Sequence, residues 1–132
     1  MATRKAGQGM RWIRLSTRLA IYHRDAWCCV YCGAPGEALG VGLSLDHVVA
    51  CELGGDNAPS NLVTACGPCN SAKHKLTMRG WCSRLRARDI NAARVSRRIR
   101  ALVRKPLDRV EGRRLERVRS ARATLWTTGG TP

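Results

Sequence analysis

The stretches Cys29-Val-Tyr-Cys32 and Cys66-Gly-Pro-Cys69 decide the fold of this chain. Each holds two cysteines in the CxxC spacing, which places two sulfurs on a single turn of the backbone. Two such turns can close a tetrahedral all-sulfur metal site, and a four-cysteine site is structural because the ion keeps no open position. The sequence therefore predicts a structural zinc ion on Cys29, Cys32, Cys66 and Cys69.

Two alternatives compete with this interpretation. The CxxC pairs could be redox motifs, but two pairs without a thioredoxin-like context make that the weaker hypothesis. Cys28 directly precedes Cys29 and is an alternative candidate for the metal ligand. Cys29 is the better candidate, because only Cys29 has the CxxC spacing to Cys32.

The cysteine count also indicates the redox conditions of the compartment in which the protein is expected. Seven cysteines are an odd number and do not suggest a disulfide framework. The first residues lack an apolar run after their basic residues, and no stretch approaches the roughly 18 apolar residues of a membrane span. We therefore expect metal-bound thiolates in a reducing, cytoplasmic setting, with no membrane partner.

Basic residues flank the cysteine region on both sides. The net charge is +5 over residues 1–27, −2 over 28–78 and +12 over 79–132, which together make +15. A near-neutral centre between basic flanks is typical of a polyanion-binding protein, although a merely solvated basic surface is the alternative. Because arginine suits two-point phosphate contacts, we expect the following arginines to contact backbone phosphates of such a polyanion: Arg79, Arg94, Arg97, Arg98 and Arg104.

Hydrophobic periodicity predicts a small α+β fold. The pattern favours a basic helix over residues 13–24, a strand over 41–49 and a polar loop over 53–60. A short apolar segment then spans 61–65, and a second helix is expected to begin near Pro68, since proline is tolerated in a first turn.

Beyond Leu76 the pattern becomes helical. Thr77 and Asp89 are candidate caps for two helices, and Pro106 is expected to break the second of these and open a third. We therefore predict a flexible basic N-terminus at 1–11, a core at 12–78 and an arginine-rich helical extension with a frayed tail at 79–132.

Between the two cysteine pairs lie residues suited to phosphodiester hydrolysis. Histidine can take a proton from an attacking water, and His47 is the candidate base. A magnesium-like cation prefers oxygen ligands and keeps several waters, so one carboxylate and one amide can suffice. Asp46 and Asn70 supply these two groups.

The same stretches resemble the HNH nuclease family in its zinc-knuckle form. They are CVYCG at 29–33, LDHVV at 45–49, GGD at 54–56, SNLV at 60–63 and CGPCNSAK at 66–73. The resemblance covers roughly residues 12–76. It implies a ββα-metal core on the four-cysteine zinc knuckle, flanked here by basic helices.

The resemblance also implies a role for each matching residue. His47 would be the general base, Asp46 would ligate a catalytic divalent ion, and Asn61 would hold a loop and so orient His47. Asn70 stands where many members have the final histidine, which indicates an HNN-type site and favours Mg²⁺ or Mn²⁺. Lys73 resembles a basic residue near the scissile phosphate.

The implied activity is metal-dependent DNA cleavage, with one strand nicked per active site. Two alternatives remain open: a zinc-dependent nucleic-acid-binding module without catalysis, and a nuclease subunit of a larger phage packaging or restriction complex. A homodimer is a further possible assembly. Small HNH chains of this kind are phage-like, so the cytoplasm of an infected bacterium is one expected location.

Overall fold

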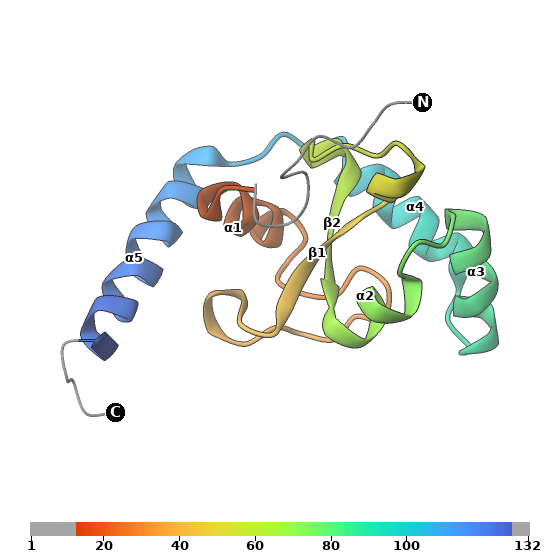
Figure 1. Cartoon of the computed structure of the whole chain (residues 1–132), viewed down its shortest axis with the longest axis horizontal. Helices are drawn as coiled ribbons and strands as arrows, with labels where there is room; N and C mark the ends of the chain where they lie inside the picture. The colour runs from red at the N-terminus through yellow and green to blue at the C-terminus, as the bar shows by residue number, and fades with distance from the viewer. Residues whose placement is uncertain (1–12, 128–132) are drawn as a thin grey trace.

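A computed structural model describes residues 13–127, with side chains described to residue 123. The N-terminal segment 1–11 and the tail beyond Thr127, for which the sequence predicts flexibility, lie outside these residues. The described chain forms helices around a two-stranded antiparallel sheet (Figure 1). None of its helices is long and apolar enough to cross a membrane.

The centre of the molecule is a hairpin followed directly by a helix. Strand β1 (Leu43–His47) pairs with β2 (Leu62–Cys66), and α2 (Gly67–Lys73) continues from β2 without a loop. Leu43 lies opposite Cys66, whereas His47 lies opposite Leu62. The register therefore places the cysteines at one end of the hairpin and His47 at the other.

Strand β1 is shorter than the 41–49 that the sequence predicts. Gly42 has a φ of 85°, which is outside the β region and ends the strand before Leu43. After His47 the chain turns into short 3₁₀ segments, η3 (Cys51–Leu53) and η4 (Pro59–Asn61), which return it to β2. A further 3₁₀ segment, η2 (Ala38–Gly40), precedes β1.

A buried ion pair fixes β2 against the first helix, α1 (Leu15–Arg24). The Arg24 guanidinium bonds the Asp25 carboxylate at 2.7 Å and donates to the carbonyls of Pro59 and Leu62 at 2.9 and 2.6 Å. The Asp25 carboxylate also accepts from the Thr64 amide at 2.8 Å. Every charge is therefore bonded, which is the condition for burying one without a large penalty.

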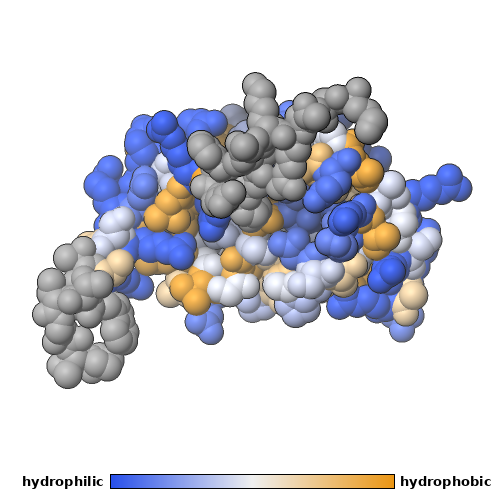
Figure 2. Space-filling model, viewed as in Figure 1, coloured by the Kyte–Doolittle hydropathy of each residue, from blue (hydrophilic) through white to orange (hydrophobic). Residues whose placement is uncertain are grey.

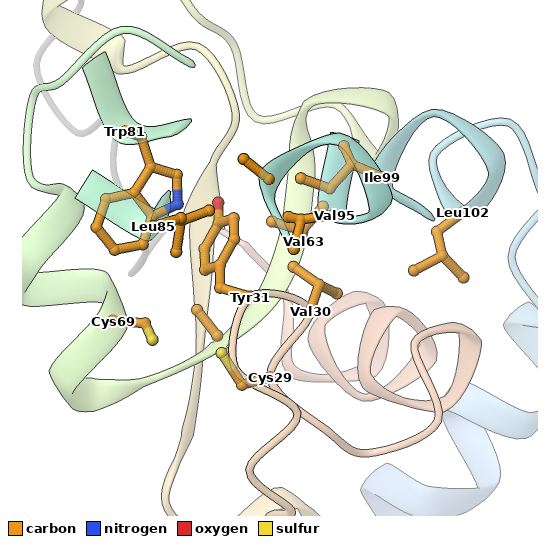
Figure 3. Close-up of a cluster of buried hydrophobic side chains, with 12 residues drawn as sticks. Cys29, Val30, Tyr31, Val63, Cys69, Trp81, Leu85, Val95, Ile99 and Leu102 are labelled. Carbon is orange, nitrogen blue, oxygen red and sulfur yellow. The ribbon is translucent and has the colours of Figure 1, made fainter. Parts of the chain in front are cut away.

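Two clusters of apolar side chains flank the hairpin. One joins α1 to α5 (Arg109–Thr127) through Leu19, Ile21, Leu45, Leu62 and Leu115. The other joins the first cysteine turn to α3 (Met78–Ala87) and α4 (Ala92–Leu102). Figure 3 shows its members around Tyr31, with the ring of Trp81 packed against the Tyr31 ring at 5.3 Å between centroids.

Of the two predicted helix caps, one agrees with the structure and one differs. Thr77 caps α3 as predicted, with its hydroxyl accepting from the Gly80 amide. Asp89 does not cap α4: it has a φ of 58° in the preceding turn, and the side chain of Asn91 accepts from the Arg94 amide instead.

Pro106 does not open the last helix either. Helix α4 ends at Leu102, and α5 begins at Arg109. The residue before α5 caps it, because the Asp108 carboxylate accepts a hydrogen bond from the Glu111 amide. Proline stops the preceding helix because it lacks an amide proton, but a side-chain acceptor is what starts the next one.

The arginine-rich helices present their charges outward. Val95, Ile99 and Leu102 are buried along one side of α4, as the sequence predicts. Arg79, Arg94, Arg97, Arg98 and Arg104 are exposed. Hydrophilic side chains are spread widely over the face seen in Figure 2, with apolar ones scattered between them.

Two helical glycines allow a test of the α1–α5 contact. A Cβ at Gly112 would lie 2.4 Å from the Ser16 carbonyl oxygen, whereas a Cβ at Gly80 would meet nothing closer than 3.5 Å. We expect Gly112→Ala to destabilise the protein by about 1–3 kcal/mol, because α5 must move away from α1. Gly80→Ala should stabilise it by up to about 1 kcal/mol through helix propensity. Denaturant unfolding measures both, and equal effects would show that the helices do not pack this closely.

Candidate metal centre and active site

The four predicted cysteines converge at the lower end of the hairpin. The sulfurs of Cys29, Cys32, Cys66 and Cys69 all lie within 4.8 Å of one another. The Cys32 and Cys66 sulfurs are 3.7 Å apart, and zinc–sulfur bonds of about 2.3 Å in a tetrahedron require about 3.8 Å. The cluster therefore fits a zinc ion in both donor type and spacing.

Cys28 lies outside this cluster. Its thiol donates to the Ala26 carbonyl at 3.2 Å, whereas Cys29 is buried and its sulfur lies beside those of Cys32, Cys66 and Cys69. The backbone explains the selection, because the Cys29 amide bonds the Ala34 carbonyl and the Gly33 amide bonds the Cys29 carbonyl, which closes the turn. A φ of 80° at Gly33 completes that turn.

The surroundings of the cluster favour a bound cation. Burial, together with the neighbouring Cys29, raises the pKa of the Cys69 thiol well above 9.0. Thiols in such a site ionise when a metal compensates the charge. The protein itself also places one positive charge at the cluster, because the Arg88 guanidinium lies 3.9 Å from the Cys69 sulfur.

Adjacent cysteines provide a matched pair for testing the metal centre. Cys29→Ser should lower the bound zinc from about one ion per chain toward none and reduce the melting temperature, because a structural site needs all four thiolates. Cys28→Ser should leave both unchanged. Zinc content and thermal unfolding measure the outcome, and zinc loss in Cys28→Ser alone would reassign the ligand.

Asp46 is almost completely buried, with 5% of its surface exposed. The Tyr31 hydroxyl donates to its Oδ2 atom, and the Lys73 ammonium lies 3.2 Å from the same oxygen. Burial raises the pKa of the Asp46 carboxyl, while Lys73 and the Tyr31 hydroxyl oppose that rise. Burial also raises the pKa of Tyr31 well above 10.0, so the phenol remains a donor.

Lys73 is fully buried beside Asp46, with no exposed surface on its side chain. Its expected position near the scissile phosphate stays a prediction. Its ammonium donates to the His47 carbonyl at 2.7 Å and pairs with Asp46. Lys73 is a buried link between α2 and β1, because an ammonium buried among apolar groups must bond the nearest carboxylate and carbonyl.

Asn61 ties the loop that follows β1. Its side-chain oxygen accepts from the Val49 amide at 2.9 Å, and its side-chain amide donates to the carbonyls of Val49 and Asp56 at 3.0 and 2.9 Å. Gly55 is needed in this loop, since a Cβ there would lie 1.7 Å from the Val49 carbonyl oxygen. The loop is thus closed tightly beside His47.

The His47 ring contacts a residue that sequence reasoning missed. Its Nε2 atom lies 2.7 Å from the Asn57 side-chain oxygen. Asn57 is one polar residue among several in the 53–60 loop, and nothing in its spacing from His47 marks it. Only the closure of the loop by Asn61 brings it to the ring.

Asn70 faces β1 from the first turns of α2. Its side-chain amide donates to the Ser44 hydroxyl at 2.9 Å and to the Leu45 carbonyl at 3.3 Å. These bonds orient the group, and its Oδ1 accepts no hydrogen bond from the part of the chain that the structure describes. Asn70 and Asp46 therefore offer the hard oxygen donors that a magnesium-like ion prefers.

The predicted phosphate-binding arginines lie elsewhere. Arg94, Arg97 and Arg98 line a groove of about 710 Å³ between α4 and the first cysteine turn, which also includes Tyr31 and Asn91. The structure thus links Lys73 of α2 to Asp46 and His47 of β1, and it holds Asn70 of α2 against Ser44 and Leu45 of the same strand. It keeps these arginines on α4.

A family model described as HNH endonuclease matches residues 29–76. Residues 29–76 are therefore similar to HNH endonucleases. The match begins at the first ligand cysteine and ends just after α2, so it contains both the cysteine cluster and the Asp46–His47 pair. This similarity implies a nuclease-type function on nucleic acid. No curated protein and no solved structure matches the chain.

Proposed function

We propose that this protein is a divalent-metal-dependent endonuclease that nicks DNA, with His47 as the general base. The observation that carries the proposal is the placement of His47 at the end of β1. Asn57 contacts its ring at 2.7 Å, and Lys73 bonds its carbonyl at 2.7 Å. A ring fixed on one side by an acceptor presents its other nitrogen in a defined direction.

In the proposed reaction His47 takes a proton from the attacking water. If Nε2–H donates to the Asn57 oxygen, the free lone pair is on Nδ1, and that nitrogen is the base. The water oxygen bonds phosphorus, and the bond from phosphorus to the 3′ oxygen breaks. The 3′ oxygen takes a proton from solvent, which gives a 3′-hydroxyl and a 5′-phosphate.

Asp46 and Asn70 are the residues that would hold the catalytic Mg²⁺ or Mn²⁺. Such an ion supplies electrostatic stabilisation of the phosphate and of the leaving oxygen. The protein holds both ligands firmly: Tyr31 and Lys73 bond one oxygen of Asp46, and Ser44 orients Asn70. Two oriented oxygen donors suit this type of ion.

Exposed arginines on the C-terminal helices support a DNA substrate. Arg94, Arg97, Arg98 and Arg104 on and after α4, with Arg79 on α3, face solvent and suit contacts along the duplex backbone. One active site cuts one strand, so a double-strand break would require two chains or two successive cuts. A phage packaging or restriction complex would be a suitable setting for such a nicking subunit.

Replacement of His47 tests the proposed base. We expect His47→Ala to lower plasmid nicking by about 10²–10⁴-fold, because general-base catalysis contributes this much. Nicking should require Mg²⁺ or Mn²⁺, and the variant should bind duplex DNA as tightly as wild type does. Unchanged nicking by the variant would refute the base. Binding without nicking by zinc-loaded wild type would instead favour a nucleic-acid-binding module.

Asn57 provides a second test with its own control. Asn57→Ala removes the acceptor for the His47 ring, and we expect kcat to fall by about tenfold to a hundredfold with little change in KM. Asn57→Asp keeps an acceptor oxygen and should retain most of the activity. Single-turnover nicking of a labelled duplex separates these cases, and equal loss in both variants would exclude an acceptor role.

A further inference from the structure

A basic cleft lies on the outer side of α2, away from the residues assigned to catalysis. It has a volume of about 370 Å³ and lies between the end of α2 and α3. Its lining residues are Ser71, Ala72, His74, Lys75, Leu76 and Arg84. Lys75 and Arg84 carry positive charge, and no carboxylate lines the cleft.

The polar groups of this cleft are unused by the fold. Among residues 13–123, the side chains of Ser71, His74, Lys75 and Arg84 take part in no hydrogen bond or ion pair. All four residues are exposed. Two like charges and two further polar groups therefore face one hollow, and no carboxylate among its lining residues offsets the charges. An anion of phosphate size would satisfy all of them.

The backbone at His74 gives a second and independent observation. His74 follows α2 with a φ of 46° and a ψ of −119°, a conformation that favours glycine. Helices often end with glycine for this reason, yet this chain has an exposed histidine without an internal partner. Within residues 13–123 the imidazole makes no hydrogen bond or ion pair, so no such bond of the described fold accounts for the strained backbone at this position.

The position of the cleft relates it to the proposed catalytic residues. Asn70 and Lys73 point from α2 toward β1, whereas Ser71 of the same helix and Lys75, two residues after its end, line the cleft. A helix with its side chains is about 10–12 Å across, and successive phosphates of one strand advance about 3.4 Å along a duplex. A strand at His47 would thus place another phosphate, about three nucleotides away, near this cleft.

We propose that the cleft binds a backbone phosphate of the DNA strand that is cut. Arg84 and Lys75 neutralise the phosphate, and the Ser71 hydroxyl and the His74 ring donate hydrogen bonds to it. This inference rests on the proposed nuclease function, which supplies the strand. The cleft would fix where along the strand the cut falls relative to the protein.

Charge removal inside and outside the cleft tests the proposal. Arg84→Gln should weaken binding of zinc-loaded protein to a fluorescent duplex by about tenfold and reduce the slope of log K against log salt by about one, as expected for one lost phosphate contact. Arg86→Gln removes the same charge from the same helix outside the cleft, and should change affinity by less than about twofold. Equal effects would overturn the site and indicate only general attraction.

His74 gives a test in which stability and binding move in opposite directions. His74→Gly should raise the melting temperature, because glycine relieves the backbone conformation, and it should weaken duplex binding by about two- to tenfold through the lost hydrogen bond. A stabilised variant that binds like wild type would show that His74 serves no ligand. Both measurements are made without Mg²⁺ or Mn²⁺, so they remain informative if the protein binds DNA without nicking it.

Discussion

The fold depends on holding the turn at Cys29–Cys32 against the junction of β2 and α2. The four sulfurs converge there, and the Val30 amide bonds the Thr64 carbonyl at 2.9 Å, which attaches the turn to the sheet. A two-stranded hairpin alone is marginally stable in water. The hairpin here has a helix directly after it, a metal-binding turn beside it and an apolar cluster on each flank. Both ends of the hairpin are therefore fixed, and a site built around His47 at the end of β1 requires such a fixed position.

The cysteine turn also reaches the proposed catalytic carboxylate. Tyr31 lies between the two cysteines of the first pair, its ring packs against Trp81, and its hydroxyl bonds Asp46. Figure 3 shows Cys29 and Cys69 on one side of the Tyr31 ring. Lys73 completes the connection from α2. Because a buried carboxylate is stable only when it is bonded, Asp46 depends on Tyr31, and the position of Tyr31 depends on the cysteine turn. Loss of the metal would therefore disturb Asp46 as well as the fold.

Much of the fold could be predicted from the sequence, because its signals are local. The CxxC spacing selected Cys29 over Cys28, and the cap at Thr77 and the buried side of α4 follow from short patterns. The errors have a common physical origin. Asn91 caps α4 instead of Asp89, because Asp89 has a φ of 58° in the turn before the helix. The residue types alone do not predict that backbone conformation.

The same limit applies at the candidate site. The burial of Lys73 and the contact between Asn57 and His47 depend on where a helix and a loop pack in space. From the sequence, a lysine on a short helix could equally be an exposed surface residue. Lys73 is buried because Asp46 lies beneath α2 and pairs with its ammonium. The roles of Asp46, His47, Asn61 and Asn70 remain predictions, now with a geometry in which each can be tested.

The basic helices show why binding and folding cannot be separated by simple truncation. Val95, Ile99 and Leu102 of α4 belong to the apolar cluster that contains Tyr31, while Arg94, Arg97 and Arg98 of the same helix line the groove beside it. Removing residues 91–132 would therefore expose the core as well as remove the arginines, and the weaker DNA binding that followed would have two causes. Neutral replacement of the exposed arginines leaves the buried side of α4 intact. Any role of the extension in holding DNA must be measured in that way, because the helix that carries the charge also covers Tyr31, which bonds the proposed catalytic carboxylate of Asp46.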